Sequence, residues 1–196
     1  MPPKKSSAPG AHAGSKPKPK GPPPAVKYYL IAYNLVSFFL WSVLLITLGK
    51  HLIMGPQTSS ALLHKVSTLL EPFRPHRKYL IKAYKNLPAP LANLLVKAST
   101  THSHIGGLVA FVQSLAVLEV VHAALGWVRS PVPTTAIQVA SRLWSVWGVT
   151  EAFDSAATSP AYPAMIFAWS ATEVIRYNFY ANQLLGNVPY LLLWAR

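Results

Sequence analysis

The chain has 196 residues, of which 52% are hydrophobic and only 12% are charged, whereas about a quarter of the residues of soluble domains carry a charge. This composition indicates that a lipid bilayer is the main solvent of the fold. The formal net charge of +13 would suggest nucleic acid as the partner of a soluble protein. Here the basic residues flank apolar segments, where anionic headgroups attract them, so no nucleic-acid partner is expected. The absence of cysteine excludes disulfides, thiolate catalysis and cysteine-ligated metals.

The N-terminal residues 1–27 consist almost entirely of Pro, Lys, Gly, Ser and Ala. Such a segment cannot bury enough apolar surface to offset the entropy lost on ordering. We therefore predict a disordered basic tail at 1–27 and a transmembrane domain at 28–196. Residues 28–48 carry no charge and read YYLIAYNLVSFFLWSVLLITL. At 1.5 Å per residue this segment can cross the ~30 Å of a hydrocarbon core, so a first transmembrane helix is expected there.

Residues 49–104 are more polar, with eight basic residues against the single acidic Glu71 and with five prolines. We predict a long basic loop outside the membrane. Three segments of this loop mix apolar and basic positions at helical spacing, which favours short helices in the membrane interface. An unstructured insertion fits the sequence equally well. The three segments read LLHKVSTLL, YLIKAYKNL and PLANLLVKA.

Three further apolar segments follow, and transmembrane helices are predicted at 105–128, 134–153 and 161–185. The residues GNVP at 186–189 predict a turn. Residues 190–196, YLLLWAR, begin like a fifth helix and stop. The expected fold is all-α, a polytopic transmembrane bundle of four helices and the stub of a fifth.

Polar residues recur at helical spacing within the last three predicted helices, which places them on one face of each helix. Charges inside a membrane face the bundle interior and mark either function or a structural pair. One interpretation is that ion pairs, such as Glu173 with Arg176 and Glu119 with Arg142, hold the helices together. Three polar faces in four helices favour a shared polar cavity instead, because a structural bundle depends more on small residues and packing. The faces carry Glu119, His122, Gly126 and Arg129; Gln138, Arg142 and Ser145; and Trp169, Glu173, Arg176 and Tyr180, with Tyr177 beside them.

His122 has three possible roles: solvation near a helix end, a bridge to Glu119, or chemistry, and we favour the first two. His122 and Arg129 also have the spacing of the H-C-x5-R loop of tyrosine phosphatases, but Ala123 stands where the nucleophilic thiolate is required. The sequence therefore excludes a cysteine-dependent phosphatase.

Two long ungapped segments carry a family resemblance. Residues 126–149 read GWVRSPVPTTAIQVASRLWSVWGV and residues 169–180 read WSATEVIRYNFY. With these segments the sequence closely resembles the very-long-chain (3R)-3-hydroxyacyl-CoA dehydratases, also called protein-tyrosine-phosphatase-like proteins. The resemblance begins near Tyr33 and Trp41, skips the basic loop, and continues from about residue 107 to the end of the sequence.

This resemblance implies a multi-pass protein of the endoplasmic reticulum membrane with six transmembrane helices. It implies a hydro-lyase that removes water from 3-hydroxyacyl-CoA to give trans-2-enoyl-CoA in the fatty-acid elongation cycle. The expected partners are the very-long-chain 3-hydroxyacyl-CoA substrate, the lipid bilayer and other fatty-acid elongation enzymes. No metal and no redox cofactor is implied.

Dehydration requires a base for the α-proton and an acid for the departing hydroxyl. In the family a Tyr and a Glu are assigned to these roles, in a block of the form RY..F..LYP.G..SE that follows the segment matching residues 191–196. Because the sequence ends at Arg196, no catalytic residue is expected within it. We expect a C-terminally truncated, inactive chain. The alternative is a non-catalytic membrane scaffold or partner in an elongase complex.

The residues expected to line the cavity or bind substrate include three arginines, which suit the bidentate binding of anions. Arg129 at the membrane edge could meet the CoA phosphates, and Arg142 or Arg176 the thioester oxygen. The basic tail favours a cytosolic N-terminus. The basic loop then lies in the lumen, against the positive-inside rule, which long loops obey weakly. The full set of candidates is Arg129, Arg142, Glu173, Arg176, Tyr177 and Tyr180.

Overall fold

The computed structural model describes residues 22–55, 65, 68–70 and 87–195. Most of the predicted basic tail and much of the predicted basic loop, with the segments LLHKVSTLL and YLIKAYKNL, lie outside the described residues. Within the described ranges every regular element is a helix and there is no strand. Two stretches, Pro24–Met54 and Ala89–Ala124, are long and apolar enough to cross a membrane. The prediction of an all-α membrane protein is confirmed.

Helix α1, Pro24–Met54, starts before and ends beyond the predicted span 28–48. Proline fits its first turn because the amide hydrogen that proline lacks would have no partner there. Lys27 and Lys50 lie inside the helix, and their long side chains can carry the charge out to the headgroups. The helix ends at Gly55, whose φ of 90° is unfavourable for other residues.

The second apolar stretch contains three consecutive helices: α3 (Ala89–Ser99), α4 (Thr101–Ser114) and α5 (Val117–Ala124). The predicted boundaries of this span, 105–128, are wrong at both ends. The helix already begins at Ala89, because the segment PLANLLVKA, for which the sequence left a helix and an unstructured loop as equal alternatives, forms a helix. It stops at Ala124 because Gly126 has a φ of 69°. There the Trp127 N–H donates to the His122 carbonyl at 3.0 Å, a helix-ending Schellman bond.

The remaining chain forms α6 (Val132–Leu143), the π-helix η2 (Trp144–Thr150), the short α7 (Asp154–Ala157) and α8 (Tyr162–Leu185). These helices occupy the segments expected at 134–153 and 161–185, although the number of membrane crossings stays a prediction. Gly186, with a φ of 83°, ends α8, and α9 follows at Tyr190–Ala195.

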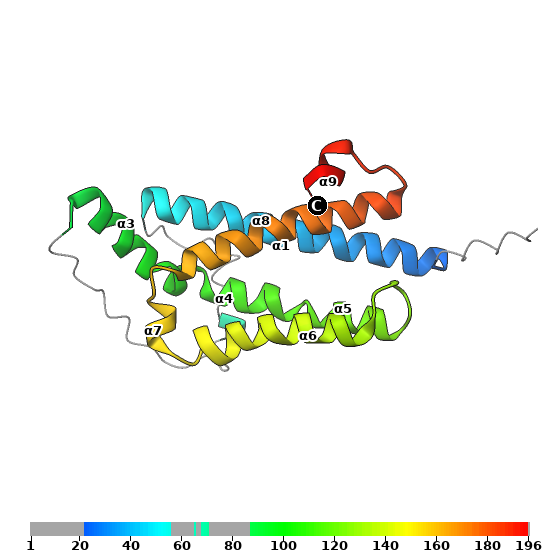
Figure 1. Cartoon of the computed structure of the whole chain (residues 1–196), viewed down its shortest axis with the longest axis horizontal. Coiled ribbons are helices and arrows are strands. Elements are labelled where there is room, and N and C mark those ends of the chain that lie inside the picture. Colours follow the sequence, from blue (N-terminus) through cyan, green and yellow to red (C-terminus); the bar gives the residue numbers. More distant parts are fainter. Residues whose placement is uncertain (1–21, 56–64, 66–67, 71–86, 196) are drawn as a thin grey trace, which may run out of the picture.

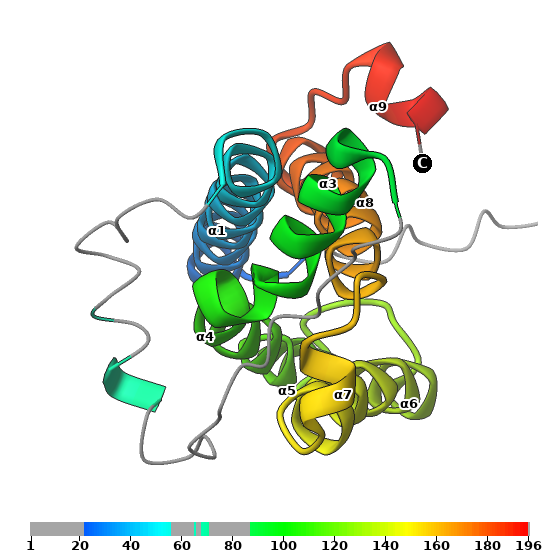
Figure 2. The same ribbon diagram turned by 90° about the vertical axis from the view of Figure 1, so that its left-hand side faces the viewer.

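The helices pack in two layers (Figure 1). Helices α1 and α8 lie side by side, and α4, α5 and α6 lie across from them. The view along the bundle shows α1 and α8 above α4, α5 and α6 (Figure 2). The start of α1, the α5–α6 turn and the end of α8 share one end of the bundle, whereas α3 and α7 lie at the other (Figure 1). The alternation of chain direction therefore places the α5–α6 turn, with Arg129, at the same end as Lys27 in the first turn of α1.

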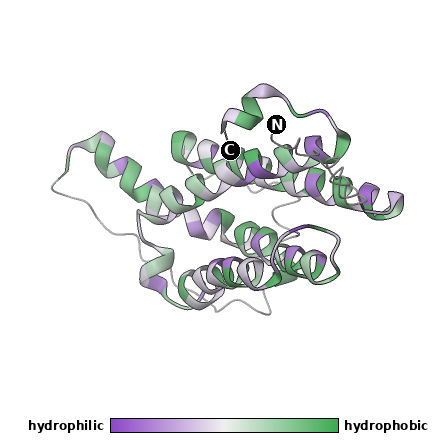
Figure 3. Ribbon diagram, turned by 45° about the vertical axis from the view of Figure 1, so that its right-hand side comes forward, coloured by the Kyte–Doolittle hydropathy of each residue, from purple (hydrophilic) through white to green (hydrophobic). Residues whose placement is uncertain are grey.

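Hydrophobic residues recur along all the long helices (Figure 3), and they both form the buried core and lie exposed on the outside of the bundle. Outward residues such as Phe39, Ile137 and Trp144 are 60%, 70% and 70% exposed. Such a surface suits hydrocarbon and would be costly in water. The interior is formed by Trp41, Leu44, Leu48, Ile105, Leu108 and Ile166.

A buried polar contact joins three helices near the α7 end of the bundle. In η2 the Glu151 N–H donates to the Val146 carbonyl at 2.7 Å, the i to i+5 bond of a π-turn. The Glu151 carboxylate lies 3.1 Å from His102 Nε2 at the start of α4, and both side chains are buried. The His102 ring meets the edge of Tyr162 at the start of α8, with 5.1 Å between ring centroids. The contact therefore fixes the ends of α4, η2 and α8 to one another.

The Glu151→Ala variant should lower the free energy of unfolding by about 2 kcal/mol, because it removes a buried hydrogen bond to a charged group. Unfolding in mixed detergent and SDS micelles measures this change. Asp154→Ala serves as the control, since Asp154 is an exposed carboxylate only three residues away. Equal effects of the two substitutions would contradict a structural role for the His102 contact.

Candidate functional site

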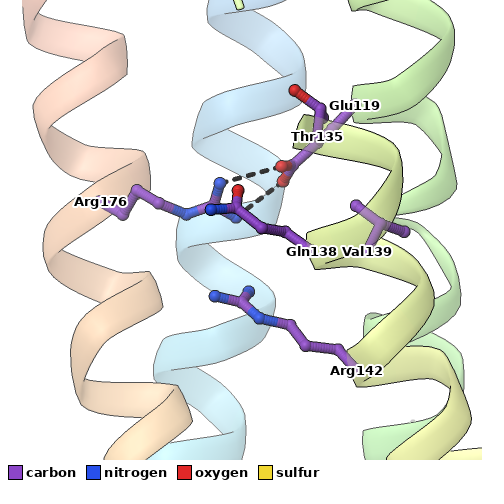
Figure 4. A pocket seen from close by; sticks show the side chains of 6 residues that line it. All are labelled: Glu119, Thr135, Gln138, Val139, Arg142 and Arg176. Atoms are coloured by element: carbon purple, nitrogen blue, oxygen red, sulfur yellow. Dashed lines mark hydrogen bonds and ion pairs between the residues drawn. The ribbon is translucent and has the colours of Figure 1, made fainter. Parts of the chain in front are cut away.

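Charged side chains from α5 and α8 meet inside the bundle (Figure 4). The Arg176 guanidinium of α8 donates two parallel hydrogen bonds to the Glu119 carboxylate of α5, with N–O distances of 2.9 and 2.7 Å. Its Nε also donates to Glu173 Oε2 at 2.7 Å, one turn earlier on α8. Bidentate pairing of this kind is the strongest geometry available to an arginine and a carboxylate. Arg176 is therefore held from two sides.

Glu173 extends this arrangement to α6. Its side chain is 2% exposed, and its second oxygen accepts a short hydrogen bond from Arg142 Nη1. We call the four residues the ion chain, in the order Glu119, Arg176, Glu173 and Arg142. Its charges alternate and sum to zero, so three helices share one neutral network.

Tyr177 completes the Glu119 end of the ion chain. Its hydroxyl donates a short hydrogen bond to Glu119 Oε1, and the Arg176 guanidinium carbon lies 4.6 Å from the centre of its ring. Glu119 thus accepts three charge-assisted or hydroxyl hydrogen bonds. The bonding of Tyr177 makes it a support of the ion pair.

The ion chain lies near the middle of the bundle. Glu173 is roughly 17 Å from each end of α8 along the helix axis, at a rise of 1.5 Å per residue. If α8 crosses a bilayer whose core is about 30 Å thick, as the sequence predicts, this position is close to the midplane. Charges at this depth are stable only when they are paired or face a polar cavity.

A narrow pocket opens beside the ion chain (Figure 4). The pocket is partly open, and the centre of a water molecule can occupy about 20 Å³ of it. This space suits single waters or a thin chain, since one water needs at least about 10 to 15 Å³. Residues from α5, α6 and α8 line it, and they are Glu119, Thr135, Gln138, Val139, Arg142 and Arg176.

A second, wider pocket lies between α8 and α9, with about 240 Å³ of space that water can occupy. Tyr180 lines this pocket and not the first, together with Thr172 and Phe179. Arg176 borders both pockets, so it forms the wall between them.

Arg129 lies outside the ion chain, in the turn between α5 and α6. The prediction that Glu119, His122, Gly126 and Arg129 share one helical face is wrong beyond His122, because α5 ends at Ala124. His122 is also not solvated: it is 3% exposed, its Nε2 lies 3.0 Å from the Tyr29 hydroxyl, and its ring stacks on Trp127. The phosphatase-like spacing therefore falls across a helix end and forms no anion-binding loop.

Of the six predicted site residues, the structure brings together Arg142, Glu173, Arg176 and Tyr177. Glu119 was expected on a polar face but not among the site residues, although three hydrogen bonds converge on it. The pocket residues Thr135 and Val139 were missed as well. Thr135 precedes Gln138 and Arg142 at helical spacing, and this signal could have found it.

Comparison with known proteins identifies the family. The family described as "Protein tyrosine phosphatase-like protein, PTPLA" matches residues 113–196. A protein of Schizosaccharomyces pombe named "Probable very-long-chain (3R)-3-hydroxyacyl-CoA dehydratase" is 38% identical over 170 residues, covering 86% of this chain. The chain belongs to this family.

Further members cover different parts of the chain. The very-long-chain (3R)-3-hydroxyacyl-CoA dehydratase 2 of Mus musculus is 30% identical over 91% of this chain. The Caenorhabditis elegans protein named "Very-long-chain (3R)-3-hydroxyacyl-CoA dehydratase hpo-8" is 51% identical over 43% of this chain. The chain spans 62% of the length of the S. pombe relative and 55% of that of the mouse relative. No solved structure matches.

The ion chain predicts energetic coupling between Arg142 and Glu173. Glu173→Ala should destabilise the protein by about 3 to 5 kcal/mol, because it leaves two arginines short of an acceptor in the bundle interior. The double variant with Arg142→Ala should cost about 1 to 3 kcal/mol less than the sum of the two single variants. Unfolding free energies in mixed micelles give this coupling.

The matched control replaces Glu119 and Arg142, which share the pocket but form no direct ion pair among the described residues. The coupling free energy between substitutions of Glu119 and Arg142 should be smaller than that between substitutions of Glu173 and Arg142. A larger coupling for Glu119 with Arg142 than for Glu173 with Arg142 would mean that the pairing described above is wrong.

Proposed function

We propose that this chain forms the membrane-embedded substrate site of a very-long-chain (3R)-3-hydroxyacyl-CoA dehydratase. The observation that carries the proposal is the ion chain with its pocket, in the middle of the helical bundle. Two relatives named as dehydratases of this kind match 86% and 91% of the chain, and these matches include the ion chain. An acyl-CoA with a very long chain is an amphiphile, and a polar site at this depth fits a thioester whose acyl tail lies among apolar helices.

The proposed reaction is an elimination within the acyl chain. A base takes a proton from C2, which the thioester carbonyl acidifies, and the electrons form the C2–C3 double bond. The C3–O bond breaks, and the hydroxyl leaves as water with a proton from an acid. Negative charge grows on the thioester oxygen as the proton departs. A fixed cation beside that oxygen would stabilise the transition state.

Arg142 is the best-placed cation for this role. Its side chain is 34% exposed, whereas its partner Glu173 is only 2% exposed. One face of the guanidinium is thus bound and another borders the pocket. Arg176 is held by two carboxylates and has fewer donors to offer.

The acid and the base are not assigned to the ion chain. Glu173 is neutralised by two arginines, and the Tyr177 hydroxyl already donates to Glu119. In the family these roles belong to the block RY..F..LYP.G..SE, which does not occur in residues 1–196. We therefore assign binding and charge stabilisation to this chain, and the proton transfers to that block.

Location and partners follow from the same proposal. We infer that the protein lies in the endoplasmic reticulum membrane, which it crosses several times. There it acts on a long, CoA-linked substrate together with other fatty-acid elongation enzymes. The start of α1, where Lys27 lies, and the α5–α6 turn, which contains Arg129, share one end of the bundle (Figure 1), and the positive-inside rule favours a cytosolic location for this end.

A chimera tests the proposed function. Residues 24–195 replace the matching part of the S. pombe relative, and the remainder of that protein supplies the rest. Because the matched parts are 38% identical, the chimera should dehydrate long-chain 3-hydroxyacyl-CoA at a rate within about tenfold of the parent. Enoyl-CoA formation in reconstituted membranes measures this rate. A chimera that folds and assembles with the elongation enzymes but has no activity would instead support a non-catalytic scaffold.

Arg129→Ala in the same chimera should raise the KM for acyl-CoA severalfold and leave turnover nearly unchanged, because Arg129 is proposed to bind phosphates that do not react. Initial rates over a range of substrate concentrations separate the two parameters. Unchanged KM and turnover would remove Arg129 from the substrate site.

A further inference from the structure

A polar stripe runs along one face of α6 toward the ion chain. Thr135, Gln138 and Arg142 follow each other at spacings of three and four residues, and all three line the narrow pocket. Arg129 lies just before the start of this helix. The α6 stripe, defined by these three residues, covers roughly 10 Å of the helix axis. It therefore leads from the end of the bundle near Arg129 to the depth of Glu173.

Gln138 is the unusual member of the α6 stripe. Its side chain is exposed, and within the described ranges its amide has no hydrogen-bond partner. It points into the pocket beside Arg176 and Glu119 (Figure 4). Exposing a primary amide to hydrocarbon costs free energy, because its N–H groups and its carbonyl oxygen then have no hydrogen-bond partners. The geometry calls for a polar occupant on this side of α6.

The pocket restricts what this occupant can be. The centre of a water molecule can occupy only about 20 Å³ of it, so the pocket is narrow and favours a thin ligand over a bulky one such as a nucleotide base. A thin chain with spaced polar groups does. The side-chain amide of Gln138 can donate an N–H to the C=O of a secondary amide and can accept the N–H of that amide with its own carbonyl oxygen. The Thr135 hydroxyl donates to the Pro131 carbonyl at 3.0 Å, so its free lone pair can accept a further N–H.

We propose that the α6 stripe binds the pantetheine arm of the acyl-CoA, an inference that rests on the proposed dehydratase function. This arm is a thin chain with two secondary amides, and it joins the CoA phosphates to the thioester. With the phosphates at Arg129 and the thioester at Arg142, the arm lies along Thr135 and Gln138. Its amides replace water in the pocket, and the stripe selects thioesters that carry them.

Binding of a ligand series to the full chain in lipid nanodiscs tests this proposal. The ligands are 3-hydroxyacyl thioesters of one acyl length, linked to CoA, to pantetheine, to N-acetylcysteamine with one amide, or to ethanethiol with none. Gln138→Leu should weaken binding of the CoA and pantetheine esters about threefold to tenfold, the value of one hydrogen bond. Binding of the ethanethiol ester should not change.

Gln183→Leu provides the matched control. Gln183 is exposed near the end of α8 and does not line the pocket, so the same substitution there should leave every affinity unchanged. If Gln138→Leu changes no affinity, or weakens the ethanethiol ester as much as the CoA ester, the pantetheine assignment is wrong while the dehydratase proposal stands. If the unaltered chain binds none of the four thioesters, the proposed function fails and this inference fails with it.

Discussion

The packing of this bundle depends on one buried carboxylate. Glu173 is buried near the middle of α8 and accepts hydrogen bonds from arginines on two helices. A carboxylate at that depth cannot remain unpaired, since a single central charge costs about 2.5 to 3.5 kcal/mol on an insertion scale. Its pairing therefore fixes α6 against α8, and Arg176 carries the same constraint on to α5. The walls of the narrow pocket consist largely of the residues that satisfy this constraint, so the site and the stability of the bundle have a common origin.

The sequence predicted the helices well because the signal is local. An uncharged segment of about 20 residues can be little else than a membrane helix. The boundaries were harder to predict, because they depend on single residues: Gly126 ends α5 through its positive φ, and lysines extend α1 beyond the hydrocarbon. The π-turn of η2 was not predictable from sequence. It brings Glu151 onto His102, so its cause lies in a residue 49 positions away.

Helical spacing also found most of the polar side chains of the site, but not their partners. Spacing assigns a residue to a face of its helix, whereas the rotation of one helix against another decides which faces meet. The ion pair between Glu119 and Arg142, which the sequence offered as one interpretation, is absent among the described residues for this reason, and each residue binds α8 instead. The sequence did not predict Glu119 as a site residue, because a single charge on an apolar helix does not reveal how many hydrogen-bond donors from other helices will contact it.

The distribution of the four charges of the ion chain over three helices has a consequence for membrane insertion. Before the bundle forms, α8 carries Glu173 and Arg176 one turn apart, α5 carries Glu119 and α6 carries Arg142, with Arg129 in the turn between them. The charges within the helices of each unit therefore sum to zero, and only Arg129 at the end of the bundle is left over. When the two units dock, Arg176 gains Glu119 and Glu173 gains Arg142 without any charge crossing hydrocarbon alone. The charges that form the ion chain after assembly therefore belong to helices whose charges balance before they dock, which lowers the cost of bringing them into a solvent that excludes single ions.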